Sequence, residues 1–245
     1  MPYTKNAEHL IKQVLIPLHH KIKENDTVNG TVEIINANLV FDATDTKLNL
    51  GEARKAQHKY IENELAWYLS QDRCIKGHPG IEDNKIWSKI CTDEGRVNSN
   101  YGFLLFSKEN GNGEFSQYEY ALKAIIKDKN TRQAIMYFCR PQLHWEYCDN
   151  INARYDFTCT ISYQIFIRNN ILCLIVTMRS NDVIRGLQCG DLPFAGYIYE
   201  KIYNELLQYY PELKYGEIMW NAASLHCYER DFILLDKIVE EYYNS

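Results

Sequence analysis

The sequence feature that most constrains the fold is a pair of apolar runs, residues 155–167 and 171–178, on either side of the polar Arg168-Asn169-Asn170. Both runs are rich in β-branched and aromatic residues. A short polar break between two such runs predicts a β-hairpin with a tight turn. We therefore expect two antiparallel strands in this part of the chain.

The length of that turn determines which residue lies opposite Cys159. With two or three residues in the turn, Cys159 pairs with Ser180 or with Arg179. A neighbouring guanidinium favours the thiolate, the reactive form of cysteine, so the pairing describes an activated nucleophile with a lowered pKa. The alternative is that Cys159 is simply one of eight cysteines, placed in a core strand, which is the commoner role of a buried cysteine.

The eight cysteines are scattered along the chain without C-x-x-C spacing. This pattern indicates neither a disulfide framework nor a zinc site. We therefore expect free thiols and no bound metal.

The net charge of −5 and the pI near 5.8 limit the possible partners. A protein that neutralises many phosphates normally has a basic face, so a nucleic acid polymer is not expected as a partner. One nucleotide phosphate needs only a few arginines. No apolar run approaches the roughly 20 residues that span a bilayer, and the N-terminus lacks a charged-then-apolar signal. We expect a cytoplasmic protein with no membrane partner.

Hydrophobic periodicity predicts the remaining elements. Helices are expected over residues 7–22, 52–70, 116–126, 191–209 and 233–243, and strands over 31–41, 131–141 and 215–228. Alternation along the last strand puts Ser224, His226 and Tyr228 on one face. No repeat, low-complexity tract or linker interrupts the chain, so one domain over residues 1–245 is expected.

Separated motifs, all in one order, carry a family resemblance. They are ELAWYL at 64–69, IW at 86–87, SNYG at 99–102, TRQAIMYFCRP at 131–141, MRSNDV at 178–183 and WNAASLHCYERDF at 220–232. Together with Cys159 they resemble the thymidylate synthase family, and within it most closely the phage deoxycytidylate (dCMP) 5-hydroxymethylases. The resemblance covers nearly the whole chain. It implies an α+β, single-domain thymidylate synthase-like fold with a central mixed or antiparallel sheet flanked by helices.

The resemblance also implies a role for each matched side chain. The catalytic set would be Cys159 as nucleophile, Tyr101 near the thiol, Asp191 at the base, and Glu64 ordering water and polarising the pyrimidine. Helical spacing alone would instead make Glu64 a solvated carboxylate beside an apolar face. The substrate would contact Arg179, Ser180, Arg132, Asp182, His226, Tyr228 and Ser224, and the folate would contact Trp87 and Asp182. Family members reach Arg132 across a dimer interface, so we expect a homodimer with shared active sites.

The family's reaction begins when a thiolate adds to C6 of a pyrimidine nucleoside monophosphate, which makes C5 nucleophilic. The one-carbon donor is 5,10-methylenetetrahydrofolate. The methylene group left on C5 then takes hydride to become methyl, or water to become hydroxymethyl. Thr160 stands where synthases have histidine and the phage hydroxymethylases have threonine, which favours water. We therefore expect conversion of dCMP or CMP to its 5-hydroxymethyl derivative.

Asp191 is the residue that favours cytosine. Near this position synthases have an asparagine that pairs with uracil O4 and N3–H, whereas a carboxylate accepts a hydrogen bond from cytosine N4. Counting eight residues on from Asp182 without a gap lands on Gly190, so the match to Asp191 requires one extra residue in this segment. The alternative is that Asp191 is merely the N-cap of the helix that follows.

Several departures from the family pattern leave alternatives open. Gln133 replaces a second phosphate-binding arginine, residues 25–30 lack the loop arginine, Arg185 replaces an apolar folate contact, and little sequence follows Tyr243. The loss of the two arginines leaves the sugar open, as deoxyribose or ribose. The competing functions are a thymidylate synthase or deoxyuridylate hydroxymethylase, and an inactive nucleotide-binding homologue. If the protein is phage-encoded, we expect it in the host cytoplasm.

Overall fold

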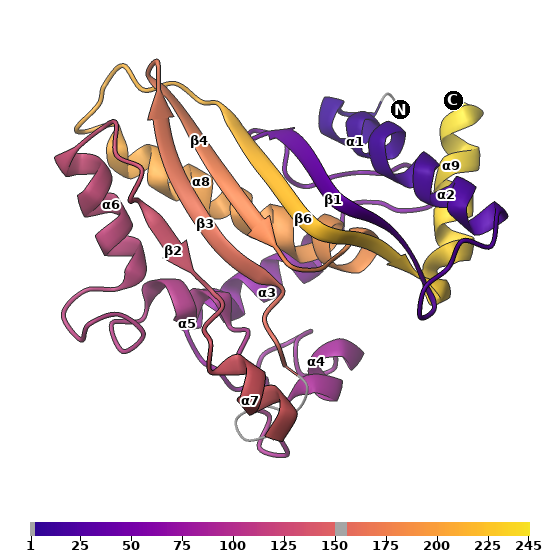
Figure 1. The fold of residues 1–245 in the computed structure, drawn as a ribbon, viewed down its shortest axis with the longest axis horizontal. Helices are drawn as coiled ribbons and strands as arrows, with labels where there is room; N and C mark the ends of the chain where they lie inside the picture. Colours follow the sequence, from indigo (N-terminus) through magenta and orange to yellow (C-terminus); the bar gives the residue numbers. More distant parts are fainter. Residues whose placement is uncertain (1–2, 150–155) are drawn as a thin grey trace.

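One mixed sheet organises the computed structural model, which describes residues 3–149 and 156–245 (Figure 1). In the described residues its strand order is β1 (Thr31–Asp42), β6 (Glu217–Tyr228), β4 (Ile171–Met178), β3 (Thr160–Arg168) and β2 (Ile135–Tyr137), and the short β5 (Asn181–Asp182) also pairs with β6. β6 runs parallel to β4 and β5, and the remaining neighbours are antiparallel. The predicted mixed sheet is confirmed.

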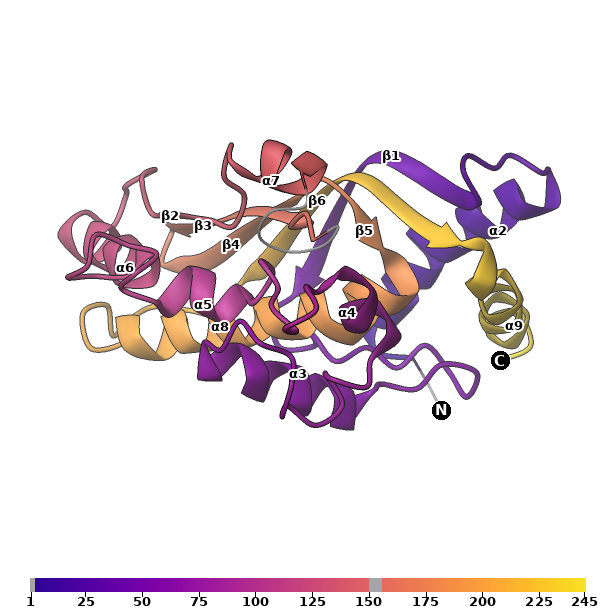
Figure 2. The same ribbon diagram turned by 90° about the horizontal axis from the view of Figure 1, so that it is seen from below.

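Helices cover one face of this sheet. In chain order the helical elements are α1 (Lys5–Leu10), the π-helix η1 (Ile11–Leu15), α2 (Ile16–Lys23), α3 (His58–Ser70), α4 (Lys85–Ile90), α5 (Tyr101–Phe106), α6 (Gln117–Lys127), α7 (Leu143–Asp149), the π-helix η2 (Val183–Asp191), α8 (Leu192–Leu206), the 3-10 turn η3 (Glu229–Asp231) and α9 (Phe232–Tyr243). Figure 2 shows α3, α5 and α8 on the same side of the sheet, whereas α7 lies toward the other side. The core forms between α8 and the strands, where Ile198, Tyr199, Leu174 and Trp220 are fully buried.

The hairpin of β3 and β4 closes with a two-residue turn. Asn169 and Asn170 occupy it with φ of 51° and 61°, a left-handed backbone that asparagine adopts more readily than most residues. A bulge near the start of β3 then shifts the register by one residue. As a result the backbone N–H of Arg179 donates to the carbonyl of Cys159 at 2.9 Å. Of the two partners predicted for Cys159, Ser180 and Arg179, the structure has Arg179, and the bulge rather than a longer turn selects it.

Two predicted elements have the wrong bounds. The helix expected over residues 52–70 begins only at His58, because the backbone N–H groups of Glu52 and Ala53 donate to the distant carboxylate of Glu241 at 2.6 and 2.9 Å. The strand expected over 131–141 is reduced to Ile135–Tyr137. Its first residues form a turn in which a side chain, Oγ1 of Thr131, accepts the N–H of Gln133, a local bond that competes with strand pairing.

Candidate active site

Cys159 lies immediately before β3, with its thiol beside the guanidinium of Arg179. The distance from Arg179 Nη2 to Cys159 Sγ is 3.6 Å. The guanidinium is held there because it also donates to the carbonyls of Thr158 at 2.9 Å and Phe157 at 2.6 Å. Cys159 as a whole is half-buried.

The electrostatic environment of this thiol differs from our expectation. Burial raises the pKa of Cys159 to about 11, although Arg179 lowers it, and the carboxylates of Asp191, Asp156 and Asp182 raise it further. The expectation of a lowered pKa is therefore wrong: desolvation of the thiolate outweighs one neighbouring cation. The thiol is therefore protonated at neutral pH.

Tyr101 borders the same sulfur from α5. Its phenol oxygen accepts the backbone N–H of Thr160 at 3.3 Å, and its ring stacks on Tyr68 with centroids 5.5 Å apart and an interplanar angle of 20°. Burial, followed by the nearby Cys159, raises the pKa of Tyr101. The phenol therefore stays neutral and can donate a hydrogen bond toward the thiol's surroundings.

Glu64 is buried rather than solvated, as the family resemblance implied. Only 5% of it is exposed, and its Oε1 accepts the hydroxyl of Tyr60 at 2.6 Å. That hydroxyl accepts the indole N–H of Trp87 at 3.2 Å. Burial raises the pKa of Glu64 to about 8, so it keeps its proton at neutral pH. Tyr60 was missed by the sequence analysis, although its position four residues before Glu64 on a helix was the signal.

The segment between Asp182 and Asp191 is a π-helix, η2. Asp182 caps its start, because its Oδ1 accepts the N–H groups of Ile184 and Arg185, both at 2.9 Å. A π-helix has more residues per turn than an α-helix and commonly arises from a single inserted residue. It can thus accommodate the extra residue that the match to Asp191 requires.

Asp191 does not cap α8, since its side chain makes no capping hydrogen bond. The N-cap interpretation is therefore wrong. Oδ2 of Asp191 instead accepts Nδ2 of Asn181 at 2.7 Å. Burial raises the pKa of Asp191 to about 6, against the lowering effect of Asn181. The carboxylate is ionised above that pH, and its charge contributes to the raised pKa values of Cys159 and Glu64, which places the three groups within electrostatic reach of one another.

The polar face predicted on the last strand is present on β6. The Oγ of Ser224 lies 3.5 Å from Nδ1 of His226, and the rings of His226 and Tyr228 meet edge to face with centroids 4.9 Å apart. β5 pairs with β6 so that Asp182 lies opposite His226. Burial lowers the pKa of His226, which favours the neutral imidazole as a hydrogen-bonding group.

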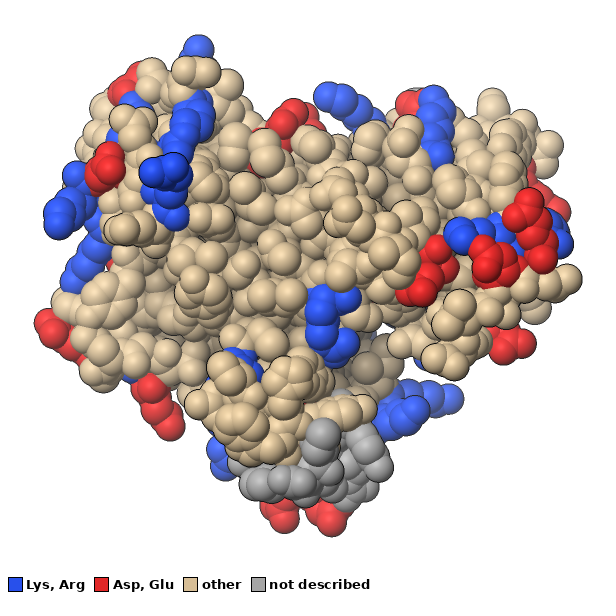
Figure 3. Space-filling model, in the orientation of Figure 1, with Lys and Arg blue, Asp and Glu red and all other residues tan. Residues whose placement is uncertain are grey.

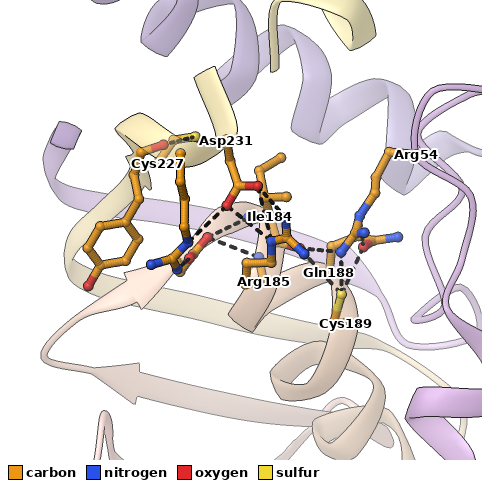
Figure 4. A network of polar contacts seen from close by, with 10 residues as sticks. Arg54, Ile184, Arg185, Gln188, Cys189, Cys227 and Asp231 are labelled. Atoms are coloured by element: carbon orange, nitrogen blue, oxygen red, sulfur yellow. Dashed lines mark hydrogen bonds and ion pairs between the residues drawn. The ribbon is translucent and has the colours of Figure 1, made fainter. Parts of the chain in front are cut away.

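Three arginines bind groups in or beside η2, and Figure 4 labels two of them, Arg54 and Arg185, together with Asp231. Arg185 forms a two-pronged pair with Asp231, with Nε 3.1 Å from both carboxylate oxygens, and Arg230 reaches Oδ2 of Asp182 at 3.3 Å. On the other side of η2, Arg54 donates to the carbonyl of Ile184 at 3.0 Å. Arg185, which replaces an apolar folate contact of the family, thus holds η2 against the start of α9.

The remaining predicted residues lie at the surface. Ser180 is half-buried beside Arg179, and Arg132 is exposed, with its carbonyl accepting Nε2 of Gln164 at 2.8 Å. Among the described residues no hydrogen bond or ion pair joins the guanidinium of Arg132 to the surroundings of Cys159. Its contribution to a neighbouring subunit's site remains a prediction.

Between residues 3 and 149 and between 156 and 245, no group of three or more His, Cys, Asp or Glu side chains could hold a metal ion. Over those same ranges, no helix has both the length and the apolar character needed to cross a membrane.

Comparisons with known proteins match nearly the whole chain. A family model described as thymidylate synthase matches residues 5–243. The deoxycytidylate 5-hydroxymethyltransferases of Enterobacteria phages T6 and T4 are 34% and 33% identical, covering 92% of this chain and 89% of each relative. The thymidylate synthase of Buchnera aphidicola subsp. Acyrthosiphon pisum (strain APS) is 26% identical, covering 88% of this chain and 76% of the relative. The thermostable thymidylate synthase A from Bacillus subtilis superposes with a TM-score of 0.63 at 22% identity, over 93% of this chain and 84% of that one, which confirms the predicted fold.

Proposed function

The chain belongs to the thymidylate synthase family, and from that premise we propose that it is a cytidylate 5-hydroxymethyltransferase. Its substrate would be dCMP or CMP, its one-carbon donor 5,10-methylenetetrahydrofolate, the co-substrate of this family, and its second reactant water. The phage relatives are named for the deoxycytidylate reaction, which supports the choice of base.

The carboxylate of Asp191 is the observation that carries the proposal. Asp191 is half-buried, so a ligand can reach it, and its pKa of about 6 leaves it ionised at neutral pH. An ionised carboxylate only accepts hydrogen bonds. Cytosine presents an N4 donor to it, whereas uracil presents the O4 acceptor, so the site is complementary to cytosine.

Once its proton has been lost to solvent, Cys159 would attack C6 of that base as the thiolate. As the sulfur–carbon bond forms, the electron pair of the C5–C6 double bond moves toward C5, which becomes the nucleophile for the one-carbon unit. Arg179 stabilises the thiolate as it forms, because its guanidinium is fixed 3.6 Å from the sulfur. A preorganised charge of this kind needs no reorientation during the reaction.

Glu64 would act on the opposite side of the base. Since its pKa is about 8, the carboxyl carries a proton at neutral pH and can donate it, directly or through water, toward the pyrimidine. Tyr60 holds the acceptor oxygen of Glu64 at 2.6 Å, and Trp87 holds Tyr60. Tyr60 and Trp87 together fix the direction in which Glu64 points.

The folate would lie against Trp87 and Asp182. Trp87 is almost fully buried, and its indole N–H is satisfied within the protein by Tyr60, so the ring offers an apolar edge. Asp182 offers Oδ2 as an acceptor once Arg230 moves, because the arginine contact is long at 3.3 Å. When bound, the folate supplies the methylene unit that C5 receives.

A homodimer through the open face of the sheet is part of the proposal. Side chains that point away from the helices form a row across neighbouring strands, from Val40 to Met219 to Ile175. Val40 is 45% exposed, and Figure 3 shows few charged side chains over the middle of this face. A large uncharged face of this kind is typical of a protein interface. A partner subunit seated there would supply the Arg132 that each site is expected to borrow.

Release of tritium from C5 tests the proposal. The protein is incubated with methylenetetrahydrofolate and with C5-labelled dCMP, CMP or dUMP. We expect tritium to be released faster from dCMP or CMP than from dUMP. Preferential release from dUMP would replace the proposal by a thymidylate synthase or deoxyuridylate hydroxymethylase, and no release from any nucleotide would indicate an inactive homologue.

A further inference from the structure

Asn181 forms a buried bridge behind Asp191. Only 2% of Asn181 and none of Trp220 is exposed. The indole N–H of Trp220 donates to Oδ1 of Asn181 at 3.1 Å, and Nδ2 of Asn181 donates to Oδ2 of Asp191 at 2.7 Å. Because an indole N–H can only donate, it fixes the amide oxygen toward Trp220 and the amide nitrogen toward Asp191.

The bridge has space made for it by a glycine of η2. A Cβ on Gly186 would lie 2.8 Å from Oδ2 of Asp191 and 3.1 Å from Nδ2 of Asn181. Any larger residue there would push the two groups apart. Since Oδ2 of Asp191 is occupied by Asn181, Oδ1 is the oxygen left for a ligand.

We propose that Asn181, oriented by Trp220, is a positioning residue for base selection: it holds Asp191 as an acceptor with Oδ1 directed at the exocyclic amino group of cytosine. This inference rests on the proposed function and deepens it, because it assigns selectivity to a pair of residues rather than to Asp191 alone. Asn181 itself does not touch the base. It acts through Asp191.

The groups around Asp191 explain why such a residue is needed. The ionisable groups whose electrostatic interactions reach it are Glu64 and Tyr68 on α3, Tyr101 on α5, Cys159 just before β3, Tyr163 on β3, and Asp182 on β5. Each of these groups is neutral when protonated and negative when ionised, so none of them stabilises the Asp191 anion by its charge. Burial and Asp182 raise the pKa of Asp191, and the hydrogen bond from Asn181 lowers it.

Loss of Asn181 therefore has a predictable direction. Without its donor, the pKa of Asp191 rises further, and the carboxyl becomes protonated closer to neutral pH. A protonated carboxyl is a donor and an acceptor at once, which matches uracil O4 and N3–H. The preference for cytosine should therefore fall, and the fall should be larger at lower pH.

The experiment measures dissociation constants of dCMP and dUMP by calorimetry between pH 5.5 and 8.5, for wild type, Asn181→Leu and Asn181→Ser. The leucine variant removes the donor and the serine variant retains a shorter one. For Asn181→Leu the Kd of dUMP divided by the Kd of dCMP should fall by about tenfold or more near neutral pH. The pH at which this ratio changes should move upward. The ratio for Asn181→Ser should lie between those of wild type and of Asn181→Leu. If Asn181→Leu does not fold, Asn181→Ser is the variant that tests the proposal.

A double variant shows whether the effect passes through Asp191. In an Asp191→Ala background, Asn181→Leu should change the ratio little, because the carboxylate that Asn181 positions is absent. The proposal would be overturned if Asn181→Leu changed the ratio equally in both backgrounds. It would also be overturned if the pH dependence of the ratio in Asn181→Leu and in Asn181→Ser were that of wild type. The binding ratio does not depend on turnover. A wild type that binds dCMP with the expected selectivity but releases no C5 tritium would thus refute the proposed function and not the role of Asn181.

Discussion

Replacement of Asp191 by asparagine should shift the base preference from cytosine toward uracil. Asn181 presents its amide nitrogen to position 191, 2.7 Å from the present Oδ2, because Trp220 holds its oxygen. An asparagine at 191 would turn its own oxygen to Asn181 and its amide N–H groups to the base. The cavity would then face N4 of cytosine with a donor, and O4 of uracil with the partner it requires.

The magnitude follows from the cost of that mismatch. A buried donor left without an acceptor costs about 1–3 kcal/mol, which is about fivefold to 150-fold in kcat/KM. The assay is kcat/KM for dCMP and dUMP at pH 8, where Asp191, with its pKa of about 6, is ionised in wild type. A ratio of the two values that stays unchanged in Asp191→Asn would refute the assignment of Asp191 to the base.

Stability provides the control for this variant. The pKa of Asp191 in the fold, about 6, lies above the value of about 4 for an unfolded aspartate. Its contribution to stability is therefore complete below about pH 4 and is lost as the pH rises through 6. Asparagine does not titrate, so Asp191→Asn should melt at a higher temperature relative to wild type at pH 8 than at pH 4. That result also shows that the variant is folded.

Three further predictions concern other parts of the site. Cys159→Ala should abolish C5 tritium release and leave dCMP binding largely intact, and undiminished release would remove Cys159 as the nucleophile. Mixed subunits of inactive Arg132→Ala and inactive Cys159→Ala should recover activity, whereas no recovery after demonstrated subunit exchange would contradict shared sites. Since burial raises the pKa of Glu64 to about 8, its stabilising effect is lost between about pH 4 and 8; Glu64→Gln should flatten the melting temperature over that range, and an unchanged slope would contradict the buried, protonated state.

The hairpin could be predicted because its signals are local. Alternating β-branched residues and the pair Asn169-Asn170 specify strands and turn within a short stretch of sequence. The bulge that selects Arg179 over Ser180 as the partner of Cys159 leaves no such signal. The bulge depends on how β3 packs against its neighbours. From the sequence, the partner of Cys159 could therefore be limited only to Ser180 or Arg179.

The electrostatics could not be predicted, because they depend on burial by distant segments. The charge of Arg179 lies next to Cys159 in the hairpin, so its lowering effect on the pKa of the thiol could be predicted from the sequence. The segments that bury Cys159, and the carboxylates of Asp156 and Asp191, come from separate parts of the fold. Together they raise the pKa of Cys159, whereas Arg179 alone would lower it. In the same way, the link from Asp191 to Asn181 and Trp220 joins η2, β5 and β6, which only the tertiary structure brings together.

The helix bounds failed for a related reason. Residues 52–57 carry helix-compatible side chains, yet two of their backbone N–H groups bond to Glu241 near the C-terminus. The extra residue before Asp191 could be counted from the sequence. Its accommodation by a π-helix could not, because that conformation depends on the capping of η2 by Asp182 and on the close approach of Gly190 to Glu64, where a Cβ would lie 2.2 Å from Oε2.

Activation of a cytosine nucleotide by Cys159, followed by addition of water, is tested by the mass of the product formed from dCMP and methylenetetrahydrofolate in water enriched in heavy oxygen. We expect dCMP that has gained a hydroxymethyl group, with the heavy oxygen in the new hydroxyl. A methylated product without the label, or a product formed from dUMP but not from dCMP or CMP, would contradict it.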